Sequence, residues 1–228
     1  MDNITDLEAI QDAAVDLAYY PVGDYLHPVF KIPYILRNAD GSFTSLDILN
    51  NQDDYVKART IEAKKIESET SAIGVIYHIN KAYRLQFLDI IQDYLSSVDL
   101  AELLAYIWVD SEGTSQDPNC SLSQLIEWFN EADKKALMGE EDYQVFVNLP
   151  SEFTVYRGIS THGNANGLSW TLNRETAEWF AKRFSFDGSQ GTVIEATAKK
   201  EDVLAYFNDR NEQEIVIDPK KLVNVSKL

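Results

Sequence analysis

Apolar residues recur at helical spacing through much of the first half of the chain. Over residues 5–19, apolar side chains every three or four positions predict a helix, and Thr5 with Glu8 matches a capping box at its start. Residues 53–110 continue this periodicity and predict further helices. We therefore expect residues 1–110 to form a mostly helical N-terminal segment.

Residues 24–52 interrupt the helical pattern with an extended, loop-rich stretch. Strand-like pieces occur at residues 30–32, 34–36 and 43–44. The sequence Asn-Ala-Asp-Gly at residues 38–41 is typical of a hairpin turn, so the last two pieces are expected to pair.

A further helix is predicted over residues 121–138. Either Ser121 or Ser123 can cap its N-terminus, and Gly139 fits the C-terminal cap. The apolar side chains of this segment recur on one face, which indicates packing against a core.

Short runs of β-branched and aromatic residues replace the helical pattern towards the C-terminus. They predict strands at residues 144–147, 153–158, 168–172, 191–196 and 211–217. Residues 173–184 predict a helix, with Asn173 as its cap. The expected fold class is therefore α+β, with an α-helical segment followed by a compact β-rich core over residues 145–228.

Charge is distributed unevenly around the total of −17. Residues 1–145 contain 26 acidic and 10 basic residues, a formal charge of −16, whereas residues 146–228 contain 11 and 10, a charge of −1. The acidic segment repels nucleic acid phosphates; it either favours a basic partner or serves solubility. The balanced segment can hold an anion locally.

Cysteine and histidine are rare in this chain. Cys120 is the only cysteine, so an internal disulfide is excluded and a reducing, cytoplasmic setting is expected. His27, His78 and His162 are scattered without zinc-ligand spacing, and His27 is expected to be structural. The N-terminus has no signal-peptide pattern, and no apolar run approaches the length of a membrane span.

Two carboxylates stand near the start of the strand predicted at residues 211–217. Because side chains alternate along a strand, Glu212 and Glu214 are expected on one face. A Glu-x-Glu pair is by itself more typical of a solvated strand edge. It indicates function only if other chemistry converges on it.

Two upstream strands carry side chains that suit an anionic ligand. Arg157 comes near a strand end beside Gly158, and a guanidinium can grip a phosphate through paired hydrogen bonds. Ser169 and Thr171 place two hydroxyls on one strand face directly before a helix. Each pattern alone is unspecific.

Taken together, these patterns resemble the arginine–serine–glutamate class of mono-ADP-ribosyltransferases. An arginine strand, a Ser-x-Thr strand followed by a helix and a Glu-x-Glu strand come in the order of that family. Residues 168–181 and 205–217 are similar to phage- and bacterium-encoded, toxin-like members. The resemblance covers about residues 145–228. It implies a split β-sandwich and a catalytic domain over residues 111–228, in which residues 111–144 supply the helical lobe.

The resemblance also implies a role for each motif residue toward NAD as substrate, without a metal. Arg157, beside Gly158, matches the residue that binds the NAD phosphates and ribose. Glu214 matches the glutamate that stabilises the oxocarbenium-like transition state and bonds the nicotinamide ribose. Ser169 matches the serine that orients this glutamate, and Thr171 matches the last position of that motif.

The acceptor side of the implied site is less defined. Glu212 matches a glutamate that contacts and activates the acceptor, and Tyr206 or Phe207 is expected in the loop that presents it. Trp170 departs from the family, where a small hydroxyl residue is common. It faces away from Ser169 on a strand, so packing is expected there.

The implied activity is transfer of ADP-ribose to a macromolecule. An arginine side chain of a protein is favoured, because a glutamate at the position of Glu212 goes mostly with arginine acceptors in the family. Modification of RNA or DNA and hydrolysis of NAD are alternatives, and a non-catalytic acidic interaction protein with a degenerate transferase fold is the competing class. Toxin-like relatives further imply a role in phage–bacterium conflict, an inhibitory partner or antitoxin, and no membrane partner. The role of residues 1–110 stays open.

Overall fold

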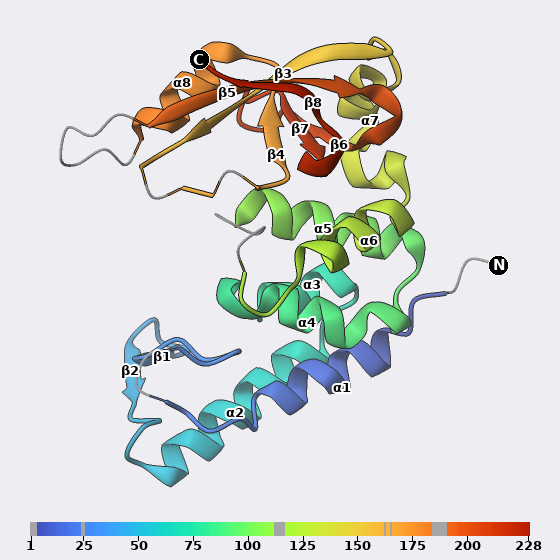
Figure 1. Cartoon of the computed structure of the whole chain (residues 1–228). Helices are drawn as coiled ribbons and strands as arrows, with labels where there is room; N and C mark the ends of the chain where they lie inside the picture. Colours follow the sequence, from blue (N-terminus) through green and yellow to red (C-terminus); the bar gives the residue numbers. More distant parts are fainter. Residues whose placement is uncertain (1–3, 24–25, 112–116, 162, 165, 184–190) are drawn as a thin grey trace. The chain divides into compact units, whose positions relative to one another are not determined.

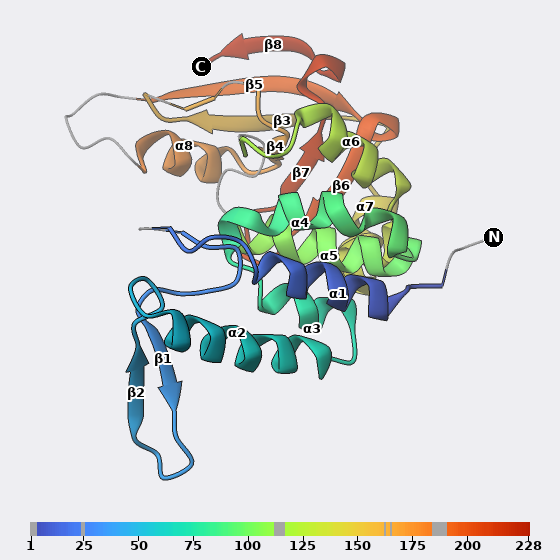
Figure 2. The same cartoon turned by 90° about the horizontal axis from the view of Figure 1, so that it is seen from below.

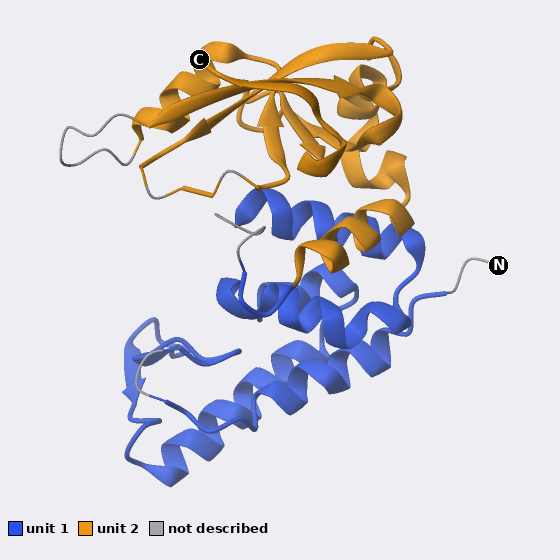
Figure 3. Cartoon of the chain, viewed as in Figure 1, with its two compact units in different colours: residues 1–111, 117–120 blue, residues 112–116, 121–228 orange. Residues whose placement is uncertain are grey.

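The computed structural model describes residues 4–23, 26–111, 117–161, 163–164, 166–183 and 191–228 (Figure 1). Two compact units divide the chain (Figure 3). Unit 1 comprises residues 1–111 and 117–120, and unit 2 comprises residues 112–116 and 121–228. His162 and Phe184, which the sequence analysis included, lie outside the described residues.

Unit 1 is built from helices around a buried apolar core. Its helices are α1 (Leu7–Leu17), α2 (Gln52–Glu67), α3 (Ala72–Tyr77), α4 (Arg84–Ile91) and α5 (Ser97–Asp110), with short 3-10 turns η1 (Lys81–Tyr83) and η2 (Gln92–Tyr94). Asn51, Ser71 and Ser96 cap α2, α3 and α5 through side-chain oxygens that accept main-chain N–H groups. The prediction of helices over residues 53–110 is confirmed.

The predicted capping box at the start of α1 is wrong. Asp6 is the N-cap, and its carboxylate accepts the N–H of Ala9 at 3.1 Å. Thr5 turns instead towards α5, where its hydroxyl donates to the carboxylate of Asp99 and accepts the N–H of Ser96 at 2.9 Å. Hydrogen bonds to residues 94 and 91 positions away therefore replace the predicted capping bonds of Thr5. A single tertiary hydrogen bond contributes about as much free energy as a capping bond, so the local pattern does not decide the outcome.

A two-stranded hairpin of β1 (Tyr34–Arg37) and β2 (Phe43–Leu46) projects from unit 1, as predicted (Figure 2). Gly41 takes the positive φ of 85° that its turn requires. The strand expected at residues 30–32 is absent from this described region, because Nδ1 of His27 accepts the N–H of Phe30 at 3.1 Å and turns the chain.

Unit 2 combines helices with one six-stranded antiparallel sheet. Its helices are α6 (Leu122–Glu131), α7 (Lys134–Val147) and α8 (Arg174–Lys182), and its 3-10 turns include η4 (Lys200–Asp202) and η5 (Pro219–Lys221). The strands are β3 (Glu152–Ile159), β4 (Ser169–Thr171), β5 (Thr192–Lys199), β6 (Val203–Phe207), β7 (Glu214–Ile217) and β8 (Val223–Lys227), in the spatial order β6-β7-β4-β3-β5-β8. The α+β fold class is confirmed. The exposed edge strand β8 was not predicted.

The sheet consists of two three-stranded halves. Strands β3 and β5 pair over eight residues, and β4 pairs with β7 over three. A single described pair, Tyr156 with Thr171, joins β3 to β4 between the halves. The junction between the halves is therefore narrow, and two of the predicted site residues, Arg157 and Ser169, lie on the strands that meet there.

Helix α8 covers the β3 side of the sheet, and α7 lies beside β6 (Figures 1 and 2). Asn173 caps α8 as predicted, accepting the N–H groups of Glu175 and Thr176. Gly158 allows the close approach, because a Cβ there would lie 1.9 Å from the carbonyl oxygen of Ala177. Helix α8 therefore packs directly against this glycine, and the predicted role of Gly158 in cofactor binding stays a prediction.

The helix predicted over residues 121–138 is present as two helices, with Ser121 as the predicted cap of the first, whereas the strand predicted over residues 144–147 is wrong. Extended backbone at Ala132 separates α6 from α7, and Asp133 caps α7. Gly139 does stop the first turns of α7 with φ 68°, but helical structure resumes and runs to Val147. A four-residue apolar run does not distinguish a strand from the last turn of a helix.

None of the helices in the described ranges is both long and apolar enough to cross a membrane.

Candidate functional site

Arg157 on β3 is held by main-chain carbonyl groups of the segment that leads into β4. Its Nε and Nη2 donate to the carbonyl oxygen of Asn164 at 3.3 and 3.0 Å, and its Nη1 donates to the carbonyl oxygen of Ser169. These bonds fix the plane of the guanidinium. The bonds to described residues engage three of its five N–H groups.

Gly167 makes room for that guanidinium. A Cβ at this position would lie 2.2 Å from Nη2 and 2.7 Å from Cζ of Arg157. Asn164 and Gly167 are therefore site residues that the sequence analysis did not single out. The glycine just before a Ser-x-Thr strand was the available signal.

The structure brings Arg157, Ser169 and Glu214 together. Glu214 lies directly opposite Thr171 in the β4–β7 ladder, so its side chain shares a sheet face with Thr171 and Ser169. Burial lowers the pKa of Arg157, and the negative charge of Glu214 acts in the opposite direction and raises it. An arginine and a carboxylate thus interact beside a strand face that carries two hydroxyl residues.

Thr171 connects two segments of this site through hydrogen bonds of its hydroxyl group. Its side chain is 5% exposed, its hydroxyl donates to the carbonyl oxygen of Glu212 at 2.6 Å, and it accepts the N–H of Asn173 at 2.9 Å. Both main-chain groups belong to segments that flank the site. The predicted contact of Thr171 with a cofactor stays a prediction.

The expectation that Glu212 and Glu214 share a strand face is wrong. Strand β7 begins only at Glu214, because Gln213 has a φ of 48° and Asn211 a φ of 57°. A left-handed residue breaks the two-residue alternation, so nothing in the ladder relates the direction of Glu212 to that of Glu214. Only Glu214 is placed by the sheet.

Hydrogen bonds on both sides keep Gln213 in this unusual conformation. Its N–H donates to Oδ1 of Asn208 at 3.1 Å, and its carbonyl oxygen accepts the N–H of Leu172 at 3.1 Å. The N–H of Asn208 in turn donates to Oδ2 of Asp142 on α7 at 2.8 Å. Burial raises the pKa of Asp142, although this bond acts against the shift. Strain of this kind persists only where its surroundings fix it, and it is common at functional sites.

Tyr206 and Phe207 do not lie in an acceptor loop. Both are in β6 and buried, each 4% exposed, and Tyr206 pairs with Ile215 of β7. The connection between β6 and β7 is the polar turn of residues 208–213. The two aromatic residues continue the apolar strand, so the predicted boundary was too early. Trp170 is 3% exposed and donates its indole N–H to the carbonyl oxygen of Gly167, which confirms that it packs inward.

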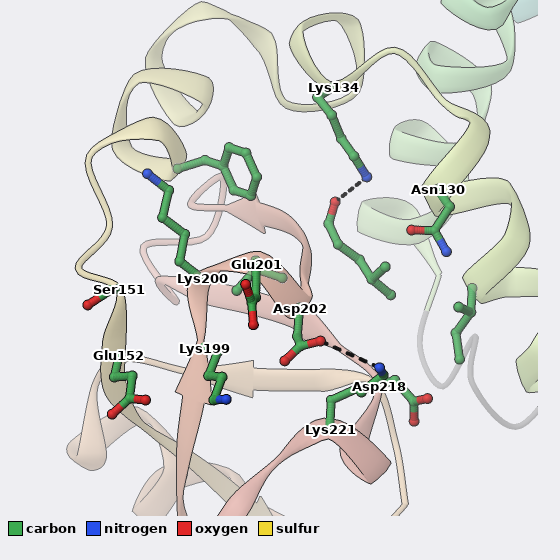
Figure 4. Close-up of a pocket in the computed structure, with 14 residues that line it drawn as sticks. Asn130, Lys134, Ser151, Glu152, Lys199, Lys200, Glu201, Asp202, Asp218 and Lys221 are labelled. Carbon is green, nitrogen blue, oxygen red and sulfur yellow. Dashed lines mark hydrogen bonds and ion pairs between the residues drawn. The ribbon is translucent and has the colours of Figure 1, made fainter.

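A cavity of about 890 Å³ lies at the other end of the sheet (Figure 4). Its lining includes Glu152 at the start of β3 and Lys199 at the end of β5, which pair with each other in the sheet. This pair is six residue pairs along the ladder from Gly158, so the cavity is separate from the site around Arg157. Four lysines and four acidic residues line the cavity: Lys134, Lys199, Lys200, Lys221, Glu152, Glu201, Asp202 and Asp218. The wall is therefore neutral overall.

Lys134, one of the lysines that line this cavity, has a structural role. Its ammonium donates to the carbonyl oxygen of Phe129 at 2.6 Å and to that of Leu204 at 2.8 Å, the bond drawn in Figure 4, and so joins the end of α6 to β6. Burial lowers its pKa. Because a helix end leaves carbonyl groups without helical partners, satisfying Phe129 explains this lysine without a ligand.

Within the described ranges, no group of three or more His, Cys, Asp and Glu side chains is arranged to hold a metal ion. Comparisons of the chain with protein-family models, curated proteins and solved structures found no match. Function is therefore argued from the geometry of the site.

Proposed function

We propose that this protein is an NAD-dependent mono-ADP-ribosyltransferase, with its catalytic site at Arg157, Ser169 and Glu214. The observation that supports this most is their convergence: Arg157 binds the Ser169 carbonyl, and Glu214 stands opposite Thr171 and interacts with Arg157 by charge. Motifs up to 57 residues apart in sequence meet at one place. The two three-stranded halves of the sheet support assignment to the split β-sandwich of these transferases.

Arg157 and Glu214 would have separate roles in the reaction. The N–H groups of Arg157 that do not donate to Asn164 or Ser169 would hold the NAD diphosphate by charge-assisted hydrogen bonds. The bond between nicotinamide and ribose breaks with its electron pair leaving on nicotinamide, and the ribose gains oxocarbenium character. The carboxylate of Glu214 stabilises that positive charge, and the acceptor attacks the ribose carbon and loses a proton.

The favoured acceptor is a protein side chain, in particular arginine, and the setting is the cytoplasm. The preference for an arginine acceptor rests on Glu212 alone. The carbonyl oxygen of Glu212 accepts a hydrogen bond from the hydroxyl of Thr171. Because Gln213 has a left-handed conformation, Glu212 lies outside β7. Acceptor choice is therefore the part of the proposal that experiment must decide.

The test is transfer of label from NAD to a cell lysate by the purified full chain. Glu214→Gln should reduce labelling by about 100-fold or more, because it removes the charge that stabilises the transition state. Glu195→Gln is the matched control, since it changes a partly buried carboxylate on β5 of the same sheet, and it should retain labelling.

Circular dichroism should show that both variants fold. Digestion of the labelled product with protease or nuclease separates a protein acceptor from a nucleic acid. Glu212→Gln should spare release of nicotinamide and reduce transfer. If the wild-type chain neither labels the lysate nor releases nicotinamide, the enzymatic proposal is rejected and a non-catalytic interaction protein becomes the better explanation.

A further inference from the structure

Unit 1 contains a cavity of about 410 Å³ that the proposed transferase site does not use. It lies between β1, the segment before it, α2 and the end of α3. Nine residues line it: Val29, Lys31, Pro33, Tyr34, Ile35, Glu62, Tyr77, His78 and Asn80. All of them belong to unit 1, so the cavity is complete within that unit.

A buried carboxylate stands at the centre of its polar wall. Glu62 is 8% exposed, and its Oε1 accepts from the hydroxyl of Tyr34 at 2.6 Å and from the ammonium of Lys65 at 2.7 Å. Burial, followed by the bond to Glu62, raises the pKa of Tyr34, which therefore stays a neutral donor. The other oxygen, Oε2, lies 3.6 Å from Nδ1 of His78, beyond hydrogen-bond length.

A second carboxylate, that of Glu69, orients the imidazole of His78 on the side away from Glu62. The Nε2 atom of His78 lies 2.8 Å from Oε1 of Glu69, so this nitrogen donates to that carboxylate. Gly74 makes room for Glu69, because a Cβ there would lie 2.3 Å from its Oε2. The backbone is thus adapted to a carboxylate that holds His78 in one orientation.

Asn80 completes the wall with another acceptor. Its amide nitrogen donates to the carbonyl oxygens of His27 and Phe30, which leaves its side-chain oxygen as the group that can accept. Tyr34, Nε2 of His78 and the amide nitrogen of Asn80 therefore donate to the protein. Among the described residues, two oxygen atoms of this wall have no donor within hydrogen-bond distance: Oε2 of Glu62 and Oδ1 of Asn80.

A wall of acceptors around a carboxylate calls for a ligand that brings donors and positive charge. Tyr34 and Tyr77 add aromatic rings, which attract cations, and Val29, Pro33 and Ile35 add apolar surface for an alkyl chain. Residues 1–111 contain 18 acidic and 8 basic residues, so the surrounding field also attracts cations. Lys31 is the one charge among the lining residues that opposes this, and it is exposed.

We propose that this cavity binds an organic cation with N–H donors, a guanidinium or alkylammonium group. The source is either a free small molecule or a basic side chain of a protein, and both present the same head group. Binding here does not depend on the NAD chemistry proposed for unit 2. If a basic side chain is the source, residues 1–110 become a recruiting surface for a basic protein.

The first test is calorimetric titration of the full chain with agmatine, a small guanidinium compound. Glu62→Gln should weaken binding by about tenfold or more, because a charged hydrogen-bond partner is lost. Lys31→Ala should tighten binding by roughly two- to fivefold, because it removes the opposing charge. Lys57→Ala, an exposed lysine of α2 outside the cavity wall, should leave it unchanged.

A second variant pair covers the case that Glu62→Gln does not fold. Ile35 is 57% exposed and lines the cavity, whereas Phe43 is 70% exposed on the same hairpin and does not. Ile35→Lys places a tethered ammonium at the cavity and should abolish agmatine binding. Phe43→Lys adds the same charge outside the wall and should reduce binding no more than about twofold.

Inorganic phosphate and a tripeptide with central arginine complete the set of probes. Tighter binding of the tripeptide than of agmatine points to a protein source, and the reverse points to a free small molecule. The proposal is overturned if no cation binds, if Lys31→Ala weakens binding, or if phosphate binds and Lys31→Ala abolishes it. The last result would mean an anion site.

Discussion

Two charged groups with little exposure, Glu62 in unit 1 and Arg157 in unit 2, are held in different ways. In unit 1, the carboxylate of Glu62 is held by the side chains of Tyr34 and Lys65, which come from β1 and α2. In unit 2, the guanidinium of Arg157 is held by the carbonyl oxygens of Asn164 and Ser169. Side chains satisfy the charge of Glu62, and the main chain satisfies that of Arg157. Arg84 of unit 1 uses both, since it donates to the carbonyl oxygen of Ile79 and to the carboxylate of Asp110.

The difference follows from what each fold leaves free. A carboxylate needs donors, and a helix uses its own N–H groups along its length, so Glu62 on α2 is held by side-chain donors. A guanidinium needs acceptors, and Arg157 finds them in the carbonyl oxygens of Asn164, before β4, and of Ser169, its first residue. The surroundings of Arg157 should therefore depend on residues that shape the backbone, and those of Glu62 on individual side-chain donors.

The largest effect is expected for Gly158→Ala. The new Cβ would meet the carbonyl oxygen of Ala177 at 1.9 Å and the nitrogen of Ala181 at 2.7 Å, and neither main-chain atom can move without shifting α8. We expect unit 2 to lose about 3 kcal/mol of unfolding free energy. Hydrogen exchange followed by mass spectrometry can measure this for unit 2 peptides.

Gly23→Ala is the control, because nothing lies within 4 Å of a Cβ at that glycine of unit 1. It should change stability by less than about 0.5 kcal/mol. An equal loss in both variants would contradict the role of backbone approach in unit 2.

Thr171→Val should have the next largest effect. It removes the bonds to the carbonyl oxygen of Glu212 and the N–H of Asn173 while keeping the shape of the side chain. The expected loss is about 1–2 kcal/mol in urea unfolding of unit 2, together with most NAD-dependent labelling. Thr192→Val, at the start of β5, is the control and should keep the labelling. Full labelling by Thr171→Val would show that the site does not need these two hydrogen bonds.

Tyr34→Phe tests the side-chain partner in unit 1. The phenol loses its bond to Glu62, and the buried carboxylate keeps Lys65, so we expect a loss of about 1 kcal/mol. Hydrogen exchange in α2 should rise, whereas peptides of β3 and β4 should not change. Faster exchange across both units would contradict the separation of the two networks.

The smallest effect concerns pH and His27. This residue is 0% exposed; its Nδ1 accepts two N–H groups, and its Nε2 lies 3.0 Å from the carbonyl oxygen of Tyr20. Burial lowers its pKa, so the folded state keeps the ring neutral while the unfolded state takes up a proton. Stability from His27 is complete above the unfolded pKa of about 6.5 and falls as pH drops towards the lowered folded value.

Urea unfolding of unit 1 at about pH 7 and about pH 5.5 measures this dependence. We expect a lower midpoint at the lower pH for the wild-type chain. The same comparison with His27→Asn, which retains an acceptor but does not titrate, should show a smaller difference. An identical pH dependence in both proteins would assign it to other groups.

The sequence alone determined the elements whose signals are local and consistent. Helical periodicity predicted the helices of residues 53–110, the Asn-Ala-Asp-Gly turn predicted the β1–β2 hairpin, and Asn173 predicted the start of α8. It also determined that Trp170 packs inward, because alternation along a strand needs no knowledge of neighbouring strands.

Tertiary structure decided what depended on partners distant in the chain. Thr5 binds the carboxylate of Asp99 and does not cap α1. Tyr206 and Phe207 belong to β6, because they pair with residues of β7. Gln213 adopted a left-handed conformation that Asn208 and Leu172 stabilise, which separated Glu212 from the face of Glu214. The sequence named Arg157, Ser169 and Glu214, but a local pattern contains no information on hydrogen bonds across tens of residues. Only the folded sheet placed the Arg157 guanidinium on main-chain carbonyl groups, with Gly167 leaving it the space.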